Sequence, residues 1–154
     1  MSARSRNDDG PGEDLGALLS QLLGVVVERE APILTAHGVT MWEYVILDRL
    51  AREDGLAQKE LARRSRRDPT RLIGHLDVLS DRGLIAREVD GADRRRRTVR
   101  LTDAGRELVR SAGDDIRQME AALLDGLAVD LRTSLAAVLS RTGAPSSLVD
   151  DGSD

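Results

Sequence analysis

The segment from Leu56 to Leu101 constrains the fold of this chain more than any other. It contains two short stretches with apolar residues at helical spacing, followed by two strand-like stretches around a run of arginines. The second helical stretch begins at Asp68 and Pro69, which suit an N-cap and a first helical turn, and it ends before Gly83. Helix, short turn, helix and β-hairpin, in that order, is the plan of a winged helix-turn-helix. We therefore predict a mainly α-helical fold with a small β-wing.

Capping residues and spacing set the expected limits of the elements around that segment. Thr40 and Glu43 form a capping box, which starts a helix that runs to about Arg52. We expect the next helix over residues 57–65 and two short strands around a basic turn over residues 87–101.

Amphipathic helices are expected on both sides of this unit. Leucines and valines recur at helical spacing after Asp14, in a first helix that we expect to break near Pro32. Thr102 is expected to cap a long helix after the wing, and Asp130 to cap the last helix. The apolar stripes of these helices exceed what the central unit needs to cover itself. We therefore expect them to pair with a second copy of the chain.

The predicted organisation is one domain between two ends whose composition is typical of disorder. The domain covers residues 13–142, with the DNA-binding winged helix at about 40–101, dimerisation helices at about 13–36 and 102–142, and disordered ends at 1–12 and 143–154.

Charge is distributed unevenly along the chain. The net charge of −4 would by itself disfavour a nucleic-acid partner. From Lys59 to Arg100, however, the chain carries 13 Lys and Arg against 7 Asp and Glu, whereas the rest carries 10 against 20. A basic block inside an acidic protein is typical of a localised phosphate-binding face. Double-stranded DNA is therefore the expected partner.

Three motifs in this segment resemble those of the MarR family of bacterial transcriptional regulators. The resemblance is close over about residues 39–108 and implies a homodimer, a palindromic operator and often a small effector that changes the affinity for DNA. The Asp-Arg-Arg wing that leads into Leu-Thr-x-x-Gly is its specific part. The motifs are Gln58-x-Glu60-Leu61-Ala62, Leu79-x-x-x-Gly83-Leu84-Ile85-x-Arg87 and Asp93-Arg94-Arg95-x-x-x-Val99-x-Leu101-Thr102-x-x-Gly105.

Side chains in the first turns of a recognition helix project into the major groove. This position selects Thr70, Arg71, Gly74 and His75, and Arg71 is the best candidate for a bidentate contact with guanine. The chain has Ile73 and Gly74 where many members of the family have a hydroxyl residue followed by arginine. Because of that departure, Arg71 and His75 become the stronger candidates for base contacts, while Gly74 can allow the backbone a close approach to DNA.

Further arginines are candidates for contacts with the minor groove and with phosphates. Inside a wing, arginines can enter a narrow minor groove, although in another context such a run would be a solvated surface. By resemblance, Arg95 is the better minor-groove candidate. The wing candidates are Arg94, Arg95, Arg96 and Arg97. The phosphate-backbone candidates are Arg63 and Arg64, with Arg66, Arg67 and Arg87 beside them.

A site for a small effector is a weaker expectation. His37, Trp42 and Tyr44 lie at the junction between the first helix and the winged-helix unit, where the resemblance implies effector binding. The alternative, which the residues favour, is that Tyr44 fills the core and Trp42 covers a surface or the dimer seam. Ligand identity does not follow from the sequence.

Several functional classes find little support in the sequence. The chain has no cysteine, only two histidines, no glycine-rich phosphate loop and no metal-ligand spacing, so we expect neither an enzyme, a cofactor nor a metal site. A polar N-terminus and the lack of an apolar run of ~20 residues predict a cytoplasmic protein without a membrane partner. The remaining alternatives are a winged-helix module that binds protein or RNA and a non-specific DNA binder. The arginine cluster and the recognition-helix chemistry favour duplex DNA.

Overall fold

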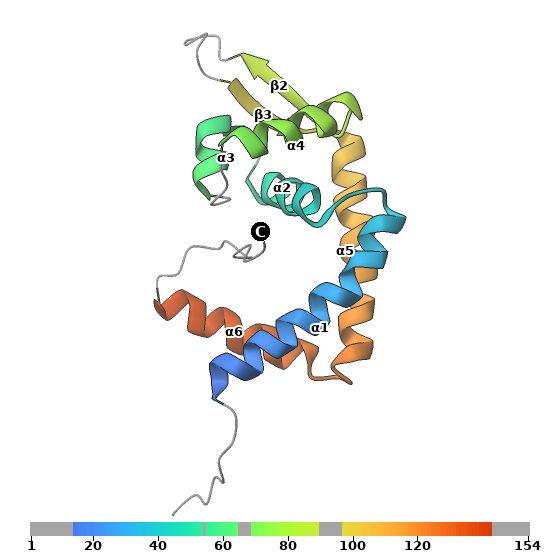
Figure 1. The fold of residues 1–154 in the computed structure, drawn as a ribbon, viewed down its shortest axis with the longest axis vertical. Helices are drawn as coiled ribbons and strands as arrows, with labels where there is room; N and C mark the ends of the chain where they lie inside the picture. Colours follow the sequence, from blue (N-terminus) through green and yellow to red (C-terminus); the bar gives the residue numbers. More distant parts are fainter. Residues whose placement is uncertain (1–13, 54, 65–68, 90–96, 143–154) are drawn as a thin grey trace, which may run out of the picture.

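The computed structural model describes residues 14–53, 55–64, 69–89 and 97–142. Helices dominate it, and a three-stranded antiparallel sheet completes the predicted winged-helix unit (Figure 1). The two ends that we expected to be disordered, residues 1–12 and 143–154, lie outside the described residues. The elements are α1 (Leu15–Ala36), α2 (Met41–Arg52), β1 (Leu56–Ala57), α3 (Gln58–Arg64), α4 (Pro69–Asp81), β2 (Ile85–Val89), β3 (Arg97–Leu101), α5 (Asp103–Leu123) and α6 (Ala128–Thr142).

The hydrophobic core lies between α2, α3, α4 and the sheet. The predicted stripe of α4 is confirmed, because Leu72, Leu76 and Leu79 are all fully buried. Gly83 ends this helix with a positive φ of 67°, which a glycine adopts without steric cost. There the Leu84 amide donates to the Leu79 carbonyl over 3.0 Å, so the chain turns sharply from α4 into the wing.

The sheet has the strand order β1-β3-β2, with Leu56 opposite Val99 and Ile85 opposite Leu101. We did not predict β1, and the expectation that Ala57 starts a helix is wrong, because α3 begins at Gln58. Two residues are too short for an alternating pattern to show. Their strand conformation comes from pairing with β3, more than forty positions away.

The expected break of the first helix at Pro32 is also wrong. Helix α1 continues through Pro32 to Ala36, although proline removes one backbone hydrogen bond and costs about 3 kcal/mol in a helix interior. The turn that follows explains why the helix continues. Its Leu34 is fully buried and Ile33 packs against the core, so burial offsets the cost of the proline.

Helix α5 docks on the turn between α4 and β2 through its first residues. As predicted, Thr102 is the N-cap, and its hydroxyl accepts a hydrogen bond from the Gly105 amide over 3.1 Å. The same hydroxyl donates to the Gly83 carbonyl over 2.7 Å. A Cβ on Gly105 would overlap the Leu84 carbonyl oxygen and lie 2.9 Å from Leu101 Cδ1. The Leu-Thr-x-x-Gly motif therefore brings two backbones into direct contact.

Three helices form the end of the molecule opposite the wing. Helix α5 runs from the winged-helix unit to this end, where α1 crosses it and α6 folds back (Figure 1). Helix α6 starts at Ala128, so the prediction that Asp130 caps it is wrong. The tight turn at Gly126, with a φ of 85°, lets the helix begin earlier, and the Leu131 amide already donates to the Leu127 carbonyl.

The terminal helices expose a large apolar surface, which we call the terminal helix face. Among the described residues of α6, only Ala128 is buried, and the first half of α1 is mostly exposed. Such a surface is typical of an interface with another chain. In the part of the chain that the structure describes, no helix has the length and apolar character needed to cross a bilayer. The face comprises Leu15, Leu18, Leu19 and Leu23 of α1 and Leu135, Val138 and Leu139 of α6.

Candidate nucleic-acid interface

Helix α4 presents the predicted base-reading residues on its outer side. Thr70, Arg71 and Gly74 are exposed and His75 is half-buried, while the three leucines of the opposite side anchor the helix in the core. Because the buried leucines hold the helix in the core, the exposed side chains are not needed to anchor it. The structure therefore brings the four predicted residues together on one rigid element.

Gly74 is exposed on this outer side of α4. A Cβ built on it would meet no other atom of the protein within 4 Å. Glycine in a helix interior costs roughly 1 kcal/mol relative to alanine, and the internal packing of this chain gives no reason for it. A close approach of something outside the chain to the backbone is the remaining physical reason.

The two arginines of α3 are bonded to carboxylates of their own chain. The Arg63 guanidinium donates twice to Glu60, over 2.9 and 2.6 Å, and the Arg64 Nε donates to Glu60 over 2.5 Å. Arg64 also forms an ion pair with Glu53. Hydrogen bonding to Arg63 lowers the pKa of Glu60 below its ordinary value. Sequence reasoning placed these arginines at phosphates and missed the acidic groups that neutralise them.

Arg87 connects the wing to the recognition helix. It is mostly buried and forms an ion pair with Asp77 of α4 over 2.8 Å, from its position on β2. Its Nη2 also donates to the Ile73 carbonyl, over 3.5 Å. The sequence groups Arg87 with the candidate phosphate contacts, and that role stays a prediction. Its two partners on α4 join the wing to the recognition helix.

The tip of the wing lies outside the described residues, and with it Arg94, Arg95 and Arg96. Directly after the tip, Arg97 is exposed at the start of β3, opposite Val89 of β2. Near it on the same strand, Arg100 pairs with Glu88 of β2 over 3.2 Å. Of the predicted wing arginines, the structure therefore describes Arg97 alone, exposed on β3, and the neighbouring strand β2 packs against α4.

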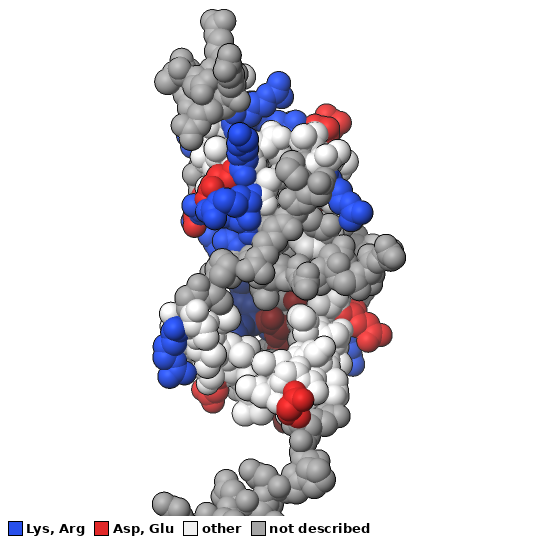
Figure 2. All heavy atoms as spheres, turned by 60° about the vertical axis from the view of Figure 1, so that its left-hand side comes forward, with Lys and Arg blue, Asp and Glu red and all other residues white. Residues whose placement is uncertain are grey.

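On one face of the molecule, basic side chains gather at the winged-helix end. In the view of Figure 2, lysine and arginine lie mainly over the winged-helix unit, and the opposite end is mostly uncharged. On this face the charge is as unevenly distributed in space as it is along the sequence, and clustered basic side chains attract phosphates.

The junction residues His37, Trp42 and Tyr44 take different places. Tyr44 packs against the core, and burial, with a contribution from Asp48, raises the pKa of its hydroxyl. His37 caps the end of α1 and its Nε2 lies 2.7 Å from an Asp115 carboxylate oxygen of α5. Trp42 is half-buried at the start of α2.

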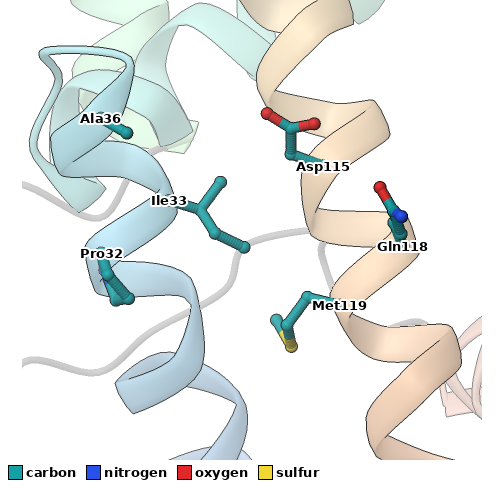
Figure 3. A pocket seen from close by; sticks show the side chains of 6 residues that line it. All are labelled: Pro32, Ile33, Ala36, Asp115, Gln118 and Met119. Carbon is teal, nitrogen blue, oxygen red and sulfur yellow. The ribbon is translucent and has the colours of Figure 1, made fainter.

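Next to His37, a pocket of about 440 Å³ lies between α1 and α5. Figure 3 shows Ile33 and Met119 reaching toward one another across it, with Asp115 near one end. None of the three junction residues lines this pocket, so sequence reasoning located the region but missed the lining residues. They are Pro32, Ile33, Ala36, Asp115, Gln118 and Met119.

A winged helix with an exposed recognition helix, a basic hairpin and long flanking helices defines a class of DNA-binding regulators. The model of the MarR family matches residues 37–96. The HTH-type transcriptional repressor Rv2887 of Mycobacterium tuberculosis is 30% identical over 137 residues, which cover 89% of this chain and 96% of the relative. The chain belongs to the MarR family of transcriptional regulators.

Solved structures share the fold of this chain. A MarR-family regulator from Rhodococcus sp. RHA1 has a TM-score of 0.75 at 24% identity, covering 92% of this chain and all of that one. The Rv2887 protein in complex with DNA has a TM-score of 0.70 at 28% identity, with coverage of 86% and 100%. The same protein in complex with salicylic acid has a TM-score of 0.65 at 28% identity, with coverage of 86% and 98%.

Proposed function

We propose that this protein is a homodimeric transcriptional repressor that binds a palindromic operator. Helix α4 enters the major groove, where Thr70, Arg71, Gly74 and His75 meet the bases, and the wing arginines Arg94 to Arg97 lie at the minor groove. One observation carries the proposal, namely the exposed, firmly anchored outer side of α4 beside a basic hairpin. The related Rv2887 protein is a repressor and has been crystallised with DNA.

The terminal helix face is the proposed dimer interface. A two-fold dimer presents its recognition helices to successive major grooves, which are about 34–36 Å apart. Such an interface would cover the leucines of α1 and α6 that the single chain leaves exposed.

The pocket between α1 and α5 is the proposed effector site, with His37 at its edge and Trp42 and Tyr44 in the helix behind it. Rv2887, which also binds salicylic acid in a crystal, supports a small-molecule effector in this chain. An effector changes operator affinity only if it binds one spacing of the recognition helices better than another. Because operator DNA is its partner, we propose a cytoplasmic location.

The decisive experiment compares binding to the duplex upstream of the coding region with binding to a shuffled duplex. Fluorescence anisotropy over a series of salt concentrations measures both affinities. We expect a preference of ~10³-fold or more and a steep dependence on salt. If binding depended on salt but was equally tight for every duplex, including duplexes selected from a random library, the protein would be a non-specific DNA binder. No binding at low salt would favour a module that binds protein or RNA.

Replacement of Glu60 should strengthen DNA binding. In the Glu60→Gln variant, Arg63 loses its charged partner and becomes available to phosphates, while Arg64 keeps its ion pair with Glu53. We expect roughly 3- to 10-fold tighter binding at low salt and a slope of log affinity against log salt that steepens by up to ~1.8, for one additional phosphate contact in each protomer of the dimer.

The matched control for this variant is Glu107→Gln. Glu107 forms the same two-bond pair with Arg110, over 3.1 and 2.5 Å, but lies on α5. The control should leave both affinity and slope unchanged. Weaker binding by Glu60→Gln would show that the carboxylate positions the arginines for DNA instead of withholding them.

A further inference from the structure

The pocket between α1 and α5 has a distinctive chemical character. Its size of about 440 Å³ falls in the range of small-molecule sites. Four of its six lining residues are apolar, and the polar side is formed by Asp115 and Gln118 of α5 (Figure 3). A ligand that fits must therefore combine an apolar body with one polar end.

The charge of the polar end follows from the lining. Asp115 is the ionisable side chain that lines the pocket, and among the described lining residues there is no lysine or arginine. The nearby Arg117 donates to Asp114 over 2.5 Å on another side of α5. An anion in the pocket would lie beside a carboxylate with no lining cation to compensate it, which is unfavourable, whereas a cation would gain an attractive partner.

The hydrogen-bonding side chains of the pocket are those of Asp115 and Gln118. A carboxylate such as Asp115 only accepts hydrogen bonds, whereas the Gln118 amide can donate or accept. An ammonium group can therefore donate to both side chains.

We propose that this pocket binds an amphipathic organic cation, with its ammonium group against Asp115 and its apolar body between Ile33 and Met119. The inference rests on the proposed function, because it names the ligand class of the effector site proposed there. It differs in charge from the salicylic acid bound by the related Rv2887 protein.

Binding of a cation competes with His37 for Asp115. The bond between His37 Nε2 and Asp115 Oδ2, 2.7 Å long, joins the end of α1 to α5. The next residue, Gly38, accepts a hydrogen bond on its carbonyl from Arg82 Nη1 over 2.6 Å, directly after the end of α4. Loss of the His37 bond frees the connection between the dimer helices and the recognition helix. More spacings of the two recognition helices become populated, and operator affinity falls.

Three probes with the same apolar body test the ligand class. Phenylbutylammonium, phenylbutanol and phenylpentanoate share a phenylbutyl body and end in a cationic, a neutral and an anionic group, and calorimetry at low salt measures their affinities for the full chain without DNA. We expect the cation to bind at least ~10-fold more tightly than the anion. Asp115→Asn should reduce this ratio to less than ~3-fold, and Asp114→Asn, at an equally exposed neighbouring carboxylate outside the pocket, should leave it unchanged.

Saturating phenylbutylammonium should also weaken operator binding by the wild-type protein and not by Asp115→Asn. Equal or tighter binding of the anion, an unchanged ratio in Asp115→Asn, or no binding of any probe would overturn the proposed ligand class. An operator affinity that ignores the bound cation would overturn the competition with His37. If the protein binds no operator even without a probe, the proposed function is contradicted. The ratio of the cation's affinity to the anion's still tests the ligand class, because it is measured without DNA.

Discussion

Replacement of Gly105 by alanine is expected to destabilise the protein by about 3 kcal/mol, at the upper end of the usual cost of overpacking. The new Cβ would overlap the backbone oxygen of Leu84, and a backbone carbonyl cannot rotate away as a flexible side chain can. Helix α5 would have to move off the turn that precedes the wing, with loss of the Thr102 bonds on both sides. Thermal unfolding at fixed protein concentration should show a midpoint roughly 6–12 °C lower.

The alanine variant of Gly74 is the control for that result. Gly74 also lies within a helix, but its Cβ would meet nothing inside the protein, so Gly74→Ala should stabilise the fold by up to about 1 kcal/mol. If Gly105→Ala lowers the stability and Gly74→Ala raises it, internal packing requires the first glycine and not the second. A Gly105→Ala midpoint within a degree or two of wild type would show that the α5 contact is not rigid.

The Arg71→Ala variant is expected to lose most of its preference for the operator over a shuffled duplex. A bidentate contact with guanine contributes ~1–3 kcal/mol of discrimination, and a palindromic operator contains the contact twice. The two contacts together amount to ~2–6 kcal/mol, so the preference should fall by roughly 30-fold or more, measured as the ratio of the two affinities in the anisotropy assay. Affinity for the shuffled duplex should change much less, because only one cation per protomer is removed.

Two further variants separate base reading from charge. Arg71→Lys retains the positive charge but lacks the planar fork, so it should lose the preference while keeping the dependence on salt. Arg110→Ala, on α5 and paired with Glu107, removes a cation far from α4 and should change neither quantity. A preference that survives in Arg71→Lys would assign base reading to other residues of α4.

Local chemistry made much of the fold predictable. The capping box of Thr40 and Glu43, the stop at Gly83 and the cap at Thr102 all form as expected, because each depends on residues that are close to one another in the sequence. The outer side of α4 was predictable for the same reason. Its buried side repeats at helical spacing, which leaves the remaining positions for solvent or DNA.

The features that were missed depend on distant partners. Strand β1 exists through its pairing with β3, and α1 continues through Pro32 because Leu34 is buried in a core built elsewhere. Arg64 shares Glu60 with Arg63 and meets Glu53 across a loop, which charge counting along the chain cannot reveal. The pocket combines residues of α1 and α5, and the bond beside it joins positions 78 residues apart.

The exposure of the terminal helix face has a consequence for gene control. Helix α6 buries little within its own chain, so the proposed dimer would cover its apolar side chains, and the amount of dimer depends on protein concentration. Below the dimer dissociation constant, the concentration of dimer rises with the square of the monomer concentration. Operator occupancy would then respond more steeply than in proportion to the amount of regulator made. A regulator built this way converts a modest change in its own synthesis into a sharper change in the expression of its targets.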